Sequence, residues 1–149
     1  MTTEVDRAHH ERPFDRFVES LRKEGTSFIS PKKFADAFDV QVQDLAADLR
    51  VHRNTINTHP ASPRIQRFLR DTLKLLSAID EIHNDMARSK SWVRNHPIPP
   101  LGHNTAWDLT LNGRADDVVA YLESISDREW MKLTADLLGV RFYSVPALK

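Results

Sequence analysis

The feature that most constrains the fold is a long apolar stripe between residues 63 and 86. In "SPRIQRFLRDTLKLLSAIDEIHNDMA" apolar side chains recur every three or four residues, which is the period of one helix face. Its members are Ile65, Phe68, Leu69, Leu73, Leu76, Ile79, Ile82 and Met86. Ser62 is suited to cap this helix and Pro63 to open it. A helix of about 24 residues would be about 36 Å long, so we expect it to link two subdomains or to form part of a dimer seam.

The segments before the stripe have the same helical spacing. Proline or serine precedes the apolar positions in residues 13–25 and 30–38, and Ser30 is a predicted N-cap with Pro31 at the first helical position. Residues 42–49 and the short piece 53–57 follow. The side chains expected to face the core are Phe14, Phe17, Val18, Leu21, Phe34, Ala37, Phe38, Val42, Leu45, Ala46 and Leu49. This part of the chain is therefore predicted to be helical.

Helical spacing also continues after the stripe. "SWVRNH" precedes the proline-rich corner "PIPPLG", and "NTAWDLTLNG" predicts a short helix capped by Asn104 and closed by Gly113. Residues 114–125 would bury Val118, Val119, Leu122 and Ile125. A capping box from Ser126 to Glu129 opens a further predicted helix, and the last ten residues are expected to be an extended tail. The last ten residues alternate only weakly and no segment indicates a convincing β-sheet, so the predicted fold class is all-α.

Composition excludes several classes of protein. The chain of 149 residues has no cysteine, which excludes disulfides and cysteine-bound metals. No apolar run approaches the roughly 18 residues of a membrane span, and the first residues lack the apolar stretch of a secretory signal. We therefore expect a cytoplasmic protein with no membrane partner.

Charge is balanced overall but uneven along the chain. A net charge of zero argues against a dedicated nucleic-acid binder. Residues 50–74 nevertheless carry six basic side chains and one acidic one, whereas residues 31–49 carry two lysines and four aspartates. This cluster is either chance or a surface that binds an anion, and its position on the predicted helices favours the second interpretation.

No pattern for catalysis or metal binding is present. The seven histidines are scattered, and neither an HExxH run nor a GxSxG elbow occurs. Four separated glycines do not make a phosphate-binding loop. We expect no enzyme activity, no catalytic residue, no metal and no cofactor. Three tryptophans, Trp92, Trp107 and Trp130, serve either as core residues or as anchors for a partner, and we expect at least one to be partly exposed.

Residues 30–79 resemble the helix-turn-helix of the Xre (lambda-repressor-like) regulators. The family core "LA-x-x-LGVS-R-x-T-L" is matched here by "LAADLRVHRNTI". Leu45 and Ala46 take the Leu-Ala pair, and Thr55 and Ile56 take the Thr-Leu pair. Two positions depart from the pattern, since Arg50 replaces the turn glycine and His52 replaces the capping serine. Each change is expected to cost about 1 kcal/mol, unless the histidine ring nitrogen substitutes as the cap.

The following segment is similar to the C-terminal domain of Xre/MbcA/ParS-type antitoxins. The similarity rests on a tryptophan-led helix, a proline loop with Leu-Gly, a short Asp-Leu helix, a glycine and a final Val-x-x-x-Leu helix. The matching residues are Trp92, Pro99, Leu101, Gly102, Asp108, Leu109, Gly113, Val118 or Val119, and Leu122. Ala106 stands where relatives tend to have proline. The two similarities together cover about residues 30 to 125.

This resemblance implies an antitoxin of a type II toxin–antitoxin system whose partner is a RES-domain, NAD⁺-consuming toxin. It implies an N-terminal extension (1–29), a helix-turn-helix domain with the linking helix (30–86) and a toxin-binding domain with a C-terminal tail (87–149). The residues expected to contact the toxin are Trp92, Trp107, Arg114, Tyr121, Tyr143, Leu148 and Lys149. Autorepression of the operon by a homodimer is expected as well.

The same resemblance selects residues for DNA binding. A recognition helix presents its N-terminal side chains to the major groove, where arginine recognises guanine and asparagine recognises adenine. Arg53, Asn54 and Asn57 are therefore expected to contact base edges. Phosphate contacts are expected from His52, Thr55, Arg64 and Arg67. Two alternatives stay open: a toxin-binding protein that no longer binds DNA, and a helix-turn-helix regulator without a toxin partner.

Overall fold

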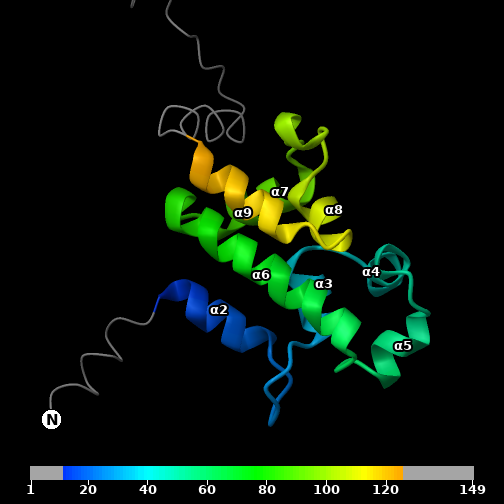
Figure 1. The fold of residues 1–149 in the computed structure, drawn as a ribbon. Helices are drawn as coiled ribbons and strands as arrows, with labels where there is room; N and C mark the ends of the chain where they lie inside the picture. The colour runs from blue at the N-terminus through cyan, green and yellow to red at the C-terminus, as the bar shows by residue number, and fades with distance from the viewer. Residues whose placement is uncertain (1–11, 126–149) are drawn as a thin grey trace, which may run out of the picture. The chain divides into compact units, whose positions relative to one another are not determined.

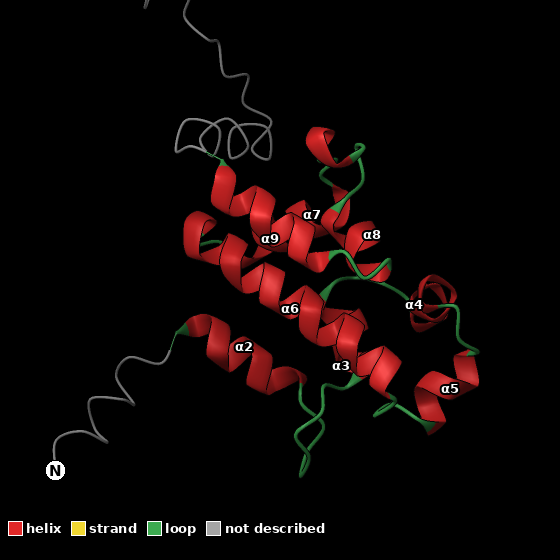
Figure 2. Ribbon diagram, viewed as in Figure 1, coloured by secondary structure: helices red, strands yellow, loops and turns green. Residues whose placement is uncertain are grey.

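The protein is seen here in a computed structural model that describes residues 12–125, and this part of the chain is made of helices joined by loops and turns (Figure 1). The helices are α2 (Pro13–Leu21), α3 (Pro31–Ala37), α4 (Val42–Leu49), α5 (Arg53–Thr58), α6 (Pro63–His83), α7 (Met86–Asn95), the 3₁₀ turn η1 (Pro99–Leu101), α8 (Ala106–Leu111) and α9 (Ala115–Ser124). Figure 2 shows only helices and connecting loops among these residues. The all-α prediction is confirmed for them.

The chain divides into two compact units, residues 1–77 and 78–149, and the division falls inside α6. The predicted boundaries lay elsewhere, after residue 29 and after residue 86. Residues 13–29 do not form a separate extension, because Leu21 and Ile29 are each only 3% exposed. α2 also contacts α3 directly. The first unit therefore includes the N-terminal helix.

The core of the first unit follows the predicted apolar spacing. Phe34 is fully buried, with its ring edge-on to Phe68 at 6.1 Å between centroids. Ser30 caps α3 as predicted, and its Oγ accepts the backbone N–H of Lys33 at 3.2 Å. Ala37 was expected to face inward but is half-buried, and Ala35 is the buried alanine of α3. Buried residues of this core are Phe14, Leu21, Ile29, Phe34, Phe38, Leu45, Leu49, Ile56, Ile65, Phe68, Leu69, Leu73, Leu75 and Leu76.

The long helix is shorter than predicted. α6 ends at His83, and Asn84 has a left-handed backbone conformation with φ 49°. Asparagine tolerates this conformation better than most residues. Asp85 then caps a new helix by accepting the N–H of Arg88 at 3.1 Å. The apolar stripe therefore stops at Ile79, since Ile82 is 45% exposed and Met86 belongs to α7.

The second unit contains α7, η1, α8 and α9, with α8 in contact with both neighbouring helices. Its short helix α8 is capped by Thr105, whose hydroxyl accepts the N–H of Asp108 at 3.1 Å, and not by Asn104 as predicted. Asn104 instead donates its side-chain amide to the carbonyl of Leu101 at 3.0 Å. In α9 Val118 and Leu122 are buried as predicted, whereas Val119 and Ile125 are only half-buried.

Within residues 12–125, no helix combines the length and the apolar character that crossing a bilayer requires. The predicted helix from Ser126 to Gly139, Trp130 and the predicted extended tail lie outside the described residues.

Candidate nucleic-acid interface

The joint between α4 and α5 is a turn of three residues, Arg50, Val51 and His52. Arg50 adopts the left-handed conformation, with φ 56° and ψ 41°, that a glycine would take more easily. The N–H of Val51 donates to the carbonyl of Ala46 at 3.0 Å and closes the end of α4. The turn is thus formed with arginine in the glycine position, at a conformational cost of about 1 kcal/mol.

His52 supplies the cap that the expected serine would have provided. Its Nδ1 accepts the backbone N–H of Asn54 at 3.3 Å, and its own carbonyl accepts the N–H of Thr55 at 2.8 Å. Because a ring nitrogen replaces the hydroxyl oxygen, the first turn of α5 keeps its cap. Both departures from the sequence pattern are therefore accommodated in the backbone.

α5 has one apolar anchor and an exposed polar face. Ile56 is 3% exposed and points into the first unit, whereas Arg53, Asn54 and Asn57 are exposed. Arg53 and Asn57 are one helical turn apart, so their side chains lie on the same face. The structure brings together the three residues predicted to contact bases.

The residues predicted to contact phosphate are more dispersed. His52 is exposed beside the start of α5, and Arg64 and Arg67 are exposed on the first two turns of α6. Thr55 is half-buried. Arg53 and Thr55 line different cavities on α5.

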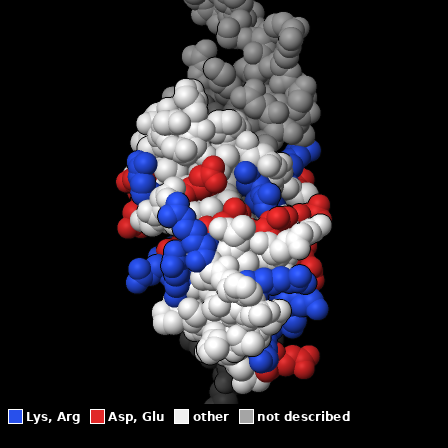
Figure 3. All heavy atoms as spheres, turned by 90° about the vertical axis from the view of Figure 1, so that its right-hand side faces the viewer, with Lys and Arg blue, Asp and Glu red and all other residues white. Residues whose placement is uncertain are grey.

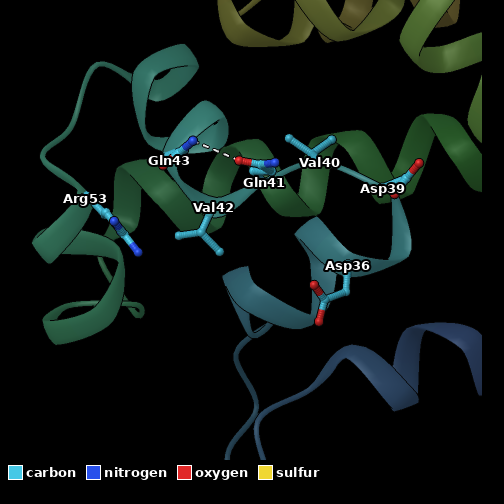
Figure 4. Close-up of a pocket in the computed structure, with 7 residues that line it drawn as sticks. All are labelled: Asp36, Asp39, Val40, Gln41, Val42, Gln43 and Arg53. Atoms are coloured by element: carbon cyan, nitrogen blue, oxygen red, sulfur yellow. Dashed lines mark hydrogen bonds between the residues drawn. The ribbon is translucent and has the colours of Figure 1, made fainter.

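The first cavity, of about 500 Å³, lies between the start of α5 and the α3–α4 connection (Figure 4). Arg53 lies at one side of it and Asp36 and Asp39 at the other. Gln41 accepts a hydrogen bond at 2.8 Å from the side-chain amide of Gln43. The sequence pattern did not select these two glutamines for the site. Their place at the start of a predicted helix is the signal that could have identified them as polar residues beside the turn. The carboxylates disfavour a phosphate here, because like charges repel.

The second cavity, of about 770 Å³, lies beside the other side of α5. Thr55 and Thr58 line it together with Lys23 and Phe28 from the turn between α2 and α3. The Lys23 ammonium lies 5.6 Å from the centroid of the Phe28 ring. Residues from the predicted N-terminal extension are therefore neighbours of α5, which no local sequence pattern indicates.

Charge on the part of the first unit that carries α4 and α5 is mixed. Figure 3 shows both basic and acidic side chains there. This agrees with the even overall balance of 21 basic and 21 acidic residues. An interface for DNA on this face must therefore depend on α5 and α6 locally and not on a large basic surface.

Of the residues predicted to contact a toxin, the structure buries both described tryptophans. Trp92 is fully buried and stacks on His96 with 5.5 Å between ring centroids. Trp107 is 4% exposed, and the Arg94 guanidinium lies 4.7 Å from its ring centroid. This favours the core interpretation for these two residues.

The other predicted toxin contacts differ in exposure. Arg114 is exposed and pairs with Asp117 at 2.8 Å, and Tyr121 is half-buried. Tyr143, Leu148 and Lys149 lie outside the described residues.

The surroundings of His83 displace the pKa of its ring. Burial lowers the pKa of its ring below 6.5, the nearby Arg88 lowers it further, and the carboxylates of Asp85 and Asp80 oppose the shift. No group of three or more His, Cys, Asp or Glu side chains within residues 12–125 is placed to hold a metal ion.

Comparison of the chain with known protein families, curated proteins and solved structures found no match.

Proposed function

We propose that this protein is a DNA-binding antitoxin that binds a RES-domain, NAD⁺-consuming toxin and represses its own operon. The observation that carries the DNA-binding half is the joint between α4 and α5. A left-handed Arg50 and a capping His52 hold a short helix with Arg53, Asn54 and Asn57 exposed on it. Side chains of these types hydrogen-bond to guanine and adenine edges in the major groove.

The toxin-binding half is supported by the similarity of residues 92–125 to the C-terminal domain of Xre/MbcA/ParS-type antitoxins. The order of helices in the second unit, α7, η1, α8 and α9, follows the order of elements in that similarity. Because Trp92 and Trp107 are buried, the toxin contact would fall to more exposed side chains such as Arg114 and Tyr121, together with the predicted contacts in the tail.

A toxin-binding protein that does not bind DNA is the second candidate. It is favoured by the zero net charge of the chain and by Asp36 and Asp39, which line the same cavity as Arg53. Carboxylates beside a base-contacting arginine reduce its attraction for DNA. A DNA-binding regulator without a toxin is the third candidate.

DNA binding is tested by gel shift with a duplex from the region upstream of the protein's own gene. An unrelated duplex of equal length and composition is the control. We expect selective retardation of the upstream duplex that weakens as salt is raised, since phosphate contacts release counterions. Equal affinity for both duplexes, or no retardation, with and without the toxin partner would contradict the DNA-binding half.

Toxin binding is tested by co-expression with the product of the neighbouring gene, followed by pull-down and an NAD⁺ consumption assay. We expect the neighbouring protein to consume NAD⁺ alone, to co-purify with this chain and to lose its activity in the complex. The isolated chain should show no NAD⁺ turnover. A neighbouring protein that neither consumes NAD⁺ nor co-purifies would favour the regulator without a toxin.

A further inference from the structure

Gln66 on α6 makes an unusual set of buried hydrogen bonds. Its side chain accepts the N–H of Ile29 at 2.9 Å and donates to the carbonyl of Ile29 at 2.8 Å. The same side-chain amide donates to the carbonyl of Pro60 at 2.8 Å. Gln66 is only 6% exposed, and its oxygen and its nitrogen both have backbone partners outside α6. A single side chain thus joins the α2–α3 turn, the α5–α6 loop and α6.

The α2–α3 turn, which contains Ile29, is held in place by backbone hydrogen bonds of its own. Its two sides meet at an antiparallel bridge between Arg22 and Ile29. The N–H of Ser30 donates to the carbonyl of Leu21 at 2.8 Å, and Ile29 is 3% exposed. Gln66 therefore connects the α5–α6 loop to an ordered part of the core.

α5 needs support at its ends. It has six residues and one buried side chain, Ile56, and so short a helix is not stable by itself in water. Its start is held by the His52 cap. Its end leads within two residues to Pro60, whose carbonyl Gln66 holds.

We infer that Gln66 is a positioning residue that sets the orientation of α5, and with it the exposed Arg53, Asn54 and Asn57. The expected effect of Gln66 on DNA affinity rests on the proposed DNA-binding function. Its effect on the orientation of α5 does not, and it can be measured without DNA. Through Ile29, the segment before residue 30 becomes part of the DNA-binding unit, although the similarity to the helix-turn-helix begins at Ser30.

The test uses Gln66→Glu in the full chain, because its effect depends on pH. As a carboxylate, the new side chain keeps the acceptor for the N–H of Ile29 but loses both donors and places a charge against two carbonyl oxygens. When protonated, it regains one donor. Burial favours the protonated form of a carboxyl group, so the new side chain should regain this donor at a pH that the protein tolerates. At about pH 8, we expect Gln66→Glu to bind the upstream duplex at least about tenfold more weakly than the natural chain does. Near pH 5.5, this difference in affinity should narrow to about threefold.

Two further variants separate positioning from loss of stability. Thr72→Val removes a buried hydroxyl on the same helix that donates to the carbonyl of Phe68 at 2.7 Å, and it should change DNA affinity by less than about twofold. Leu73→Ala makes a cavity in the same core and should lower the melting temperature without a pH-dependent loss of DNA affinity. If Leu73→Ala weakens DNA binding with the same pH profile as Gln66→Glu, the positioning role is wrong.

An NMR readout tests the inference without DNA. In Gln66→Glu, the backbone amide shifts of Ile29 and residues 53–58 should change between about pH 8 and pH 5.5 beyond the change in the natural chain, whereas those of α8 should not. Unchanged α5 shifts would overturn the inference. If the α5 shifts respond but the natural chain does not bind the duplex, the positioning of α5 stands and the proposed DNA-binding function fails.

Discussion

The resemblance selected residues in both units, and these residues differ in exposure to solvent: those of α5 are exposed, whereas the tryptophans of the second unit are buried. In the first unit, the selected residues of α5 are exposed, and the backbone around them is held by polar contacts at its ends. In the second unit, the selected tryptophans are in the core, with 0% and 4% exposure. The residues that the resemblance selects are therefore of two kinds, exposed ones that are predicted to contact a partner and buried ones that pack in the core. Mutations distinguish them, because the first kind should change binding and the second kind stability.

The largest expected effect is on stability, at the buried tryptophan of α7. Trp92→Ala removes a fully buried ring and should lower the free energy of unfolding of the second unit by about 3–5 kcal/mol. Chemical denaturation followed by circular dichroism measures it. Arg114→Ala is the matched control: its side chain is exposed and its ion pair with Asp117 is at the surface, so we expect a change below about 1 kcal/mol. A small loss for Trp92→Ala would mean that it is not a core residue.

The second effect is on binding, at the start of α5. Arg53→Ala should weaken specific DNA binding by about 1–3 kcal/mol and leave the melting temperature nearly unchanged, because this side chain is exposed. Arg67→Ala is the control for a phosphate contact. It should weaken binding to the upstream and unrelated duplexes alike and reduce the salt slope by about 1. If Arg53→Ala leaves affinity and footprint unchanged, α5 is not the helix that recognises DNA.

The third effect tests the turn itself. Arg50→Gly relieves the left-handed strain of about 1 kcal/mol, but the greater flexibility of glycine in the unfolded chain offsets about half of it, so the free energy of unfolding should rise by about 0.5 kcal/mol. Arg50→Ala removes the same charge but keeps the strained φ of 56°, so it should give no such gain. Thermal and chemical unfolding measure the change in the free energy of unfolding for both variants. Equal gains in the two would show that charge and not backbone strain is the cause.

How much of the fold was predictable from the sequence depends on where the controlling interactions lie. Ser30 and Pro31 set a helix start by local chemistry, and the sequence predicted it correctly. Asn104 and Thr105 are adjacent residues with similar capping ability, and the choice between them depends on tertiary geometry. The end of α6 was missed because apolar spacing continues past Asn84, while the left-handed conformation of that residue leaves no mark in the pattern.

In the candidate site, too, some features depend on local residues and others on contacts between distant parts of the chain. The resemblance to a helix-turn-helix selected Arg53, Asn54 and Asn57, and all three are exposed on α5. The role of Gln66 was not predictable, because its partners are backbone atoms up to 37 residues away and carry no side-chain signal. The local sequence therefore indicates which side chains α5 presents, whereas distant backbone contacts determine how the helix is held.

The smallest expected effect is the pH dependence of the second unit, at His83. The folded protein holds the pKa of this ring below 6.5 through burial and Arg88, while Asp85, Asp80 and His96 also act on it. The unfolded chain binds the proton near pH 6.5, so the stability that neutral His83 contributes is complete above that pH. It is lost as pH falls from 6.5 through the lower pKa of the folded state. We therefore expect the melting temperature of the natural chain to fall more than that of His83→Gln between about pH 7.5 and pH 5. Parallel curves for the two proteins would show that the half-buried His83 does not contribute to the pH dependence of stability.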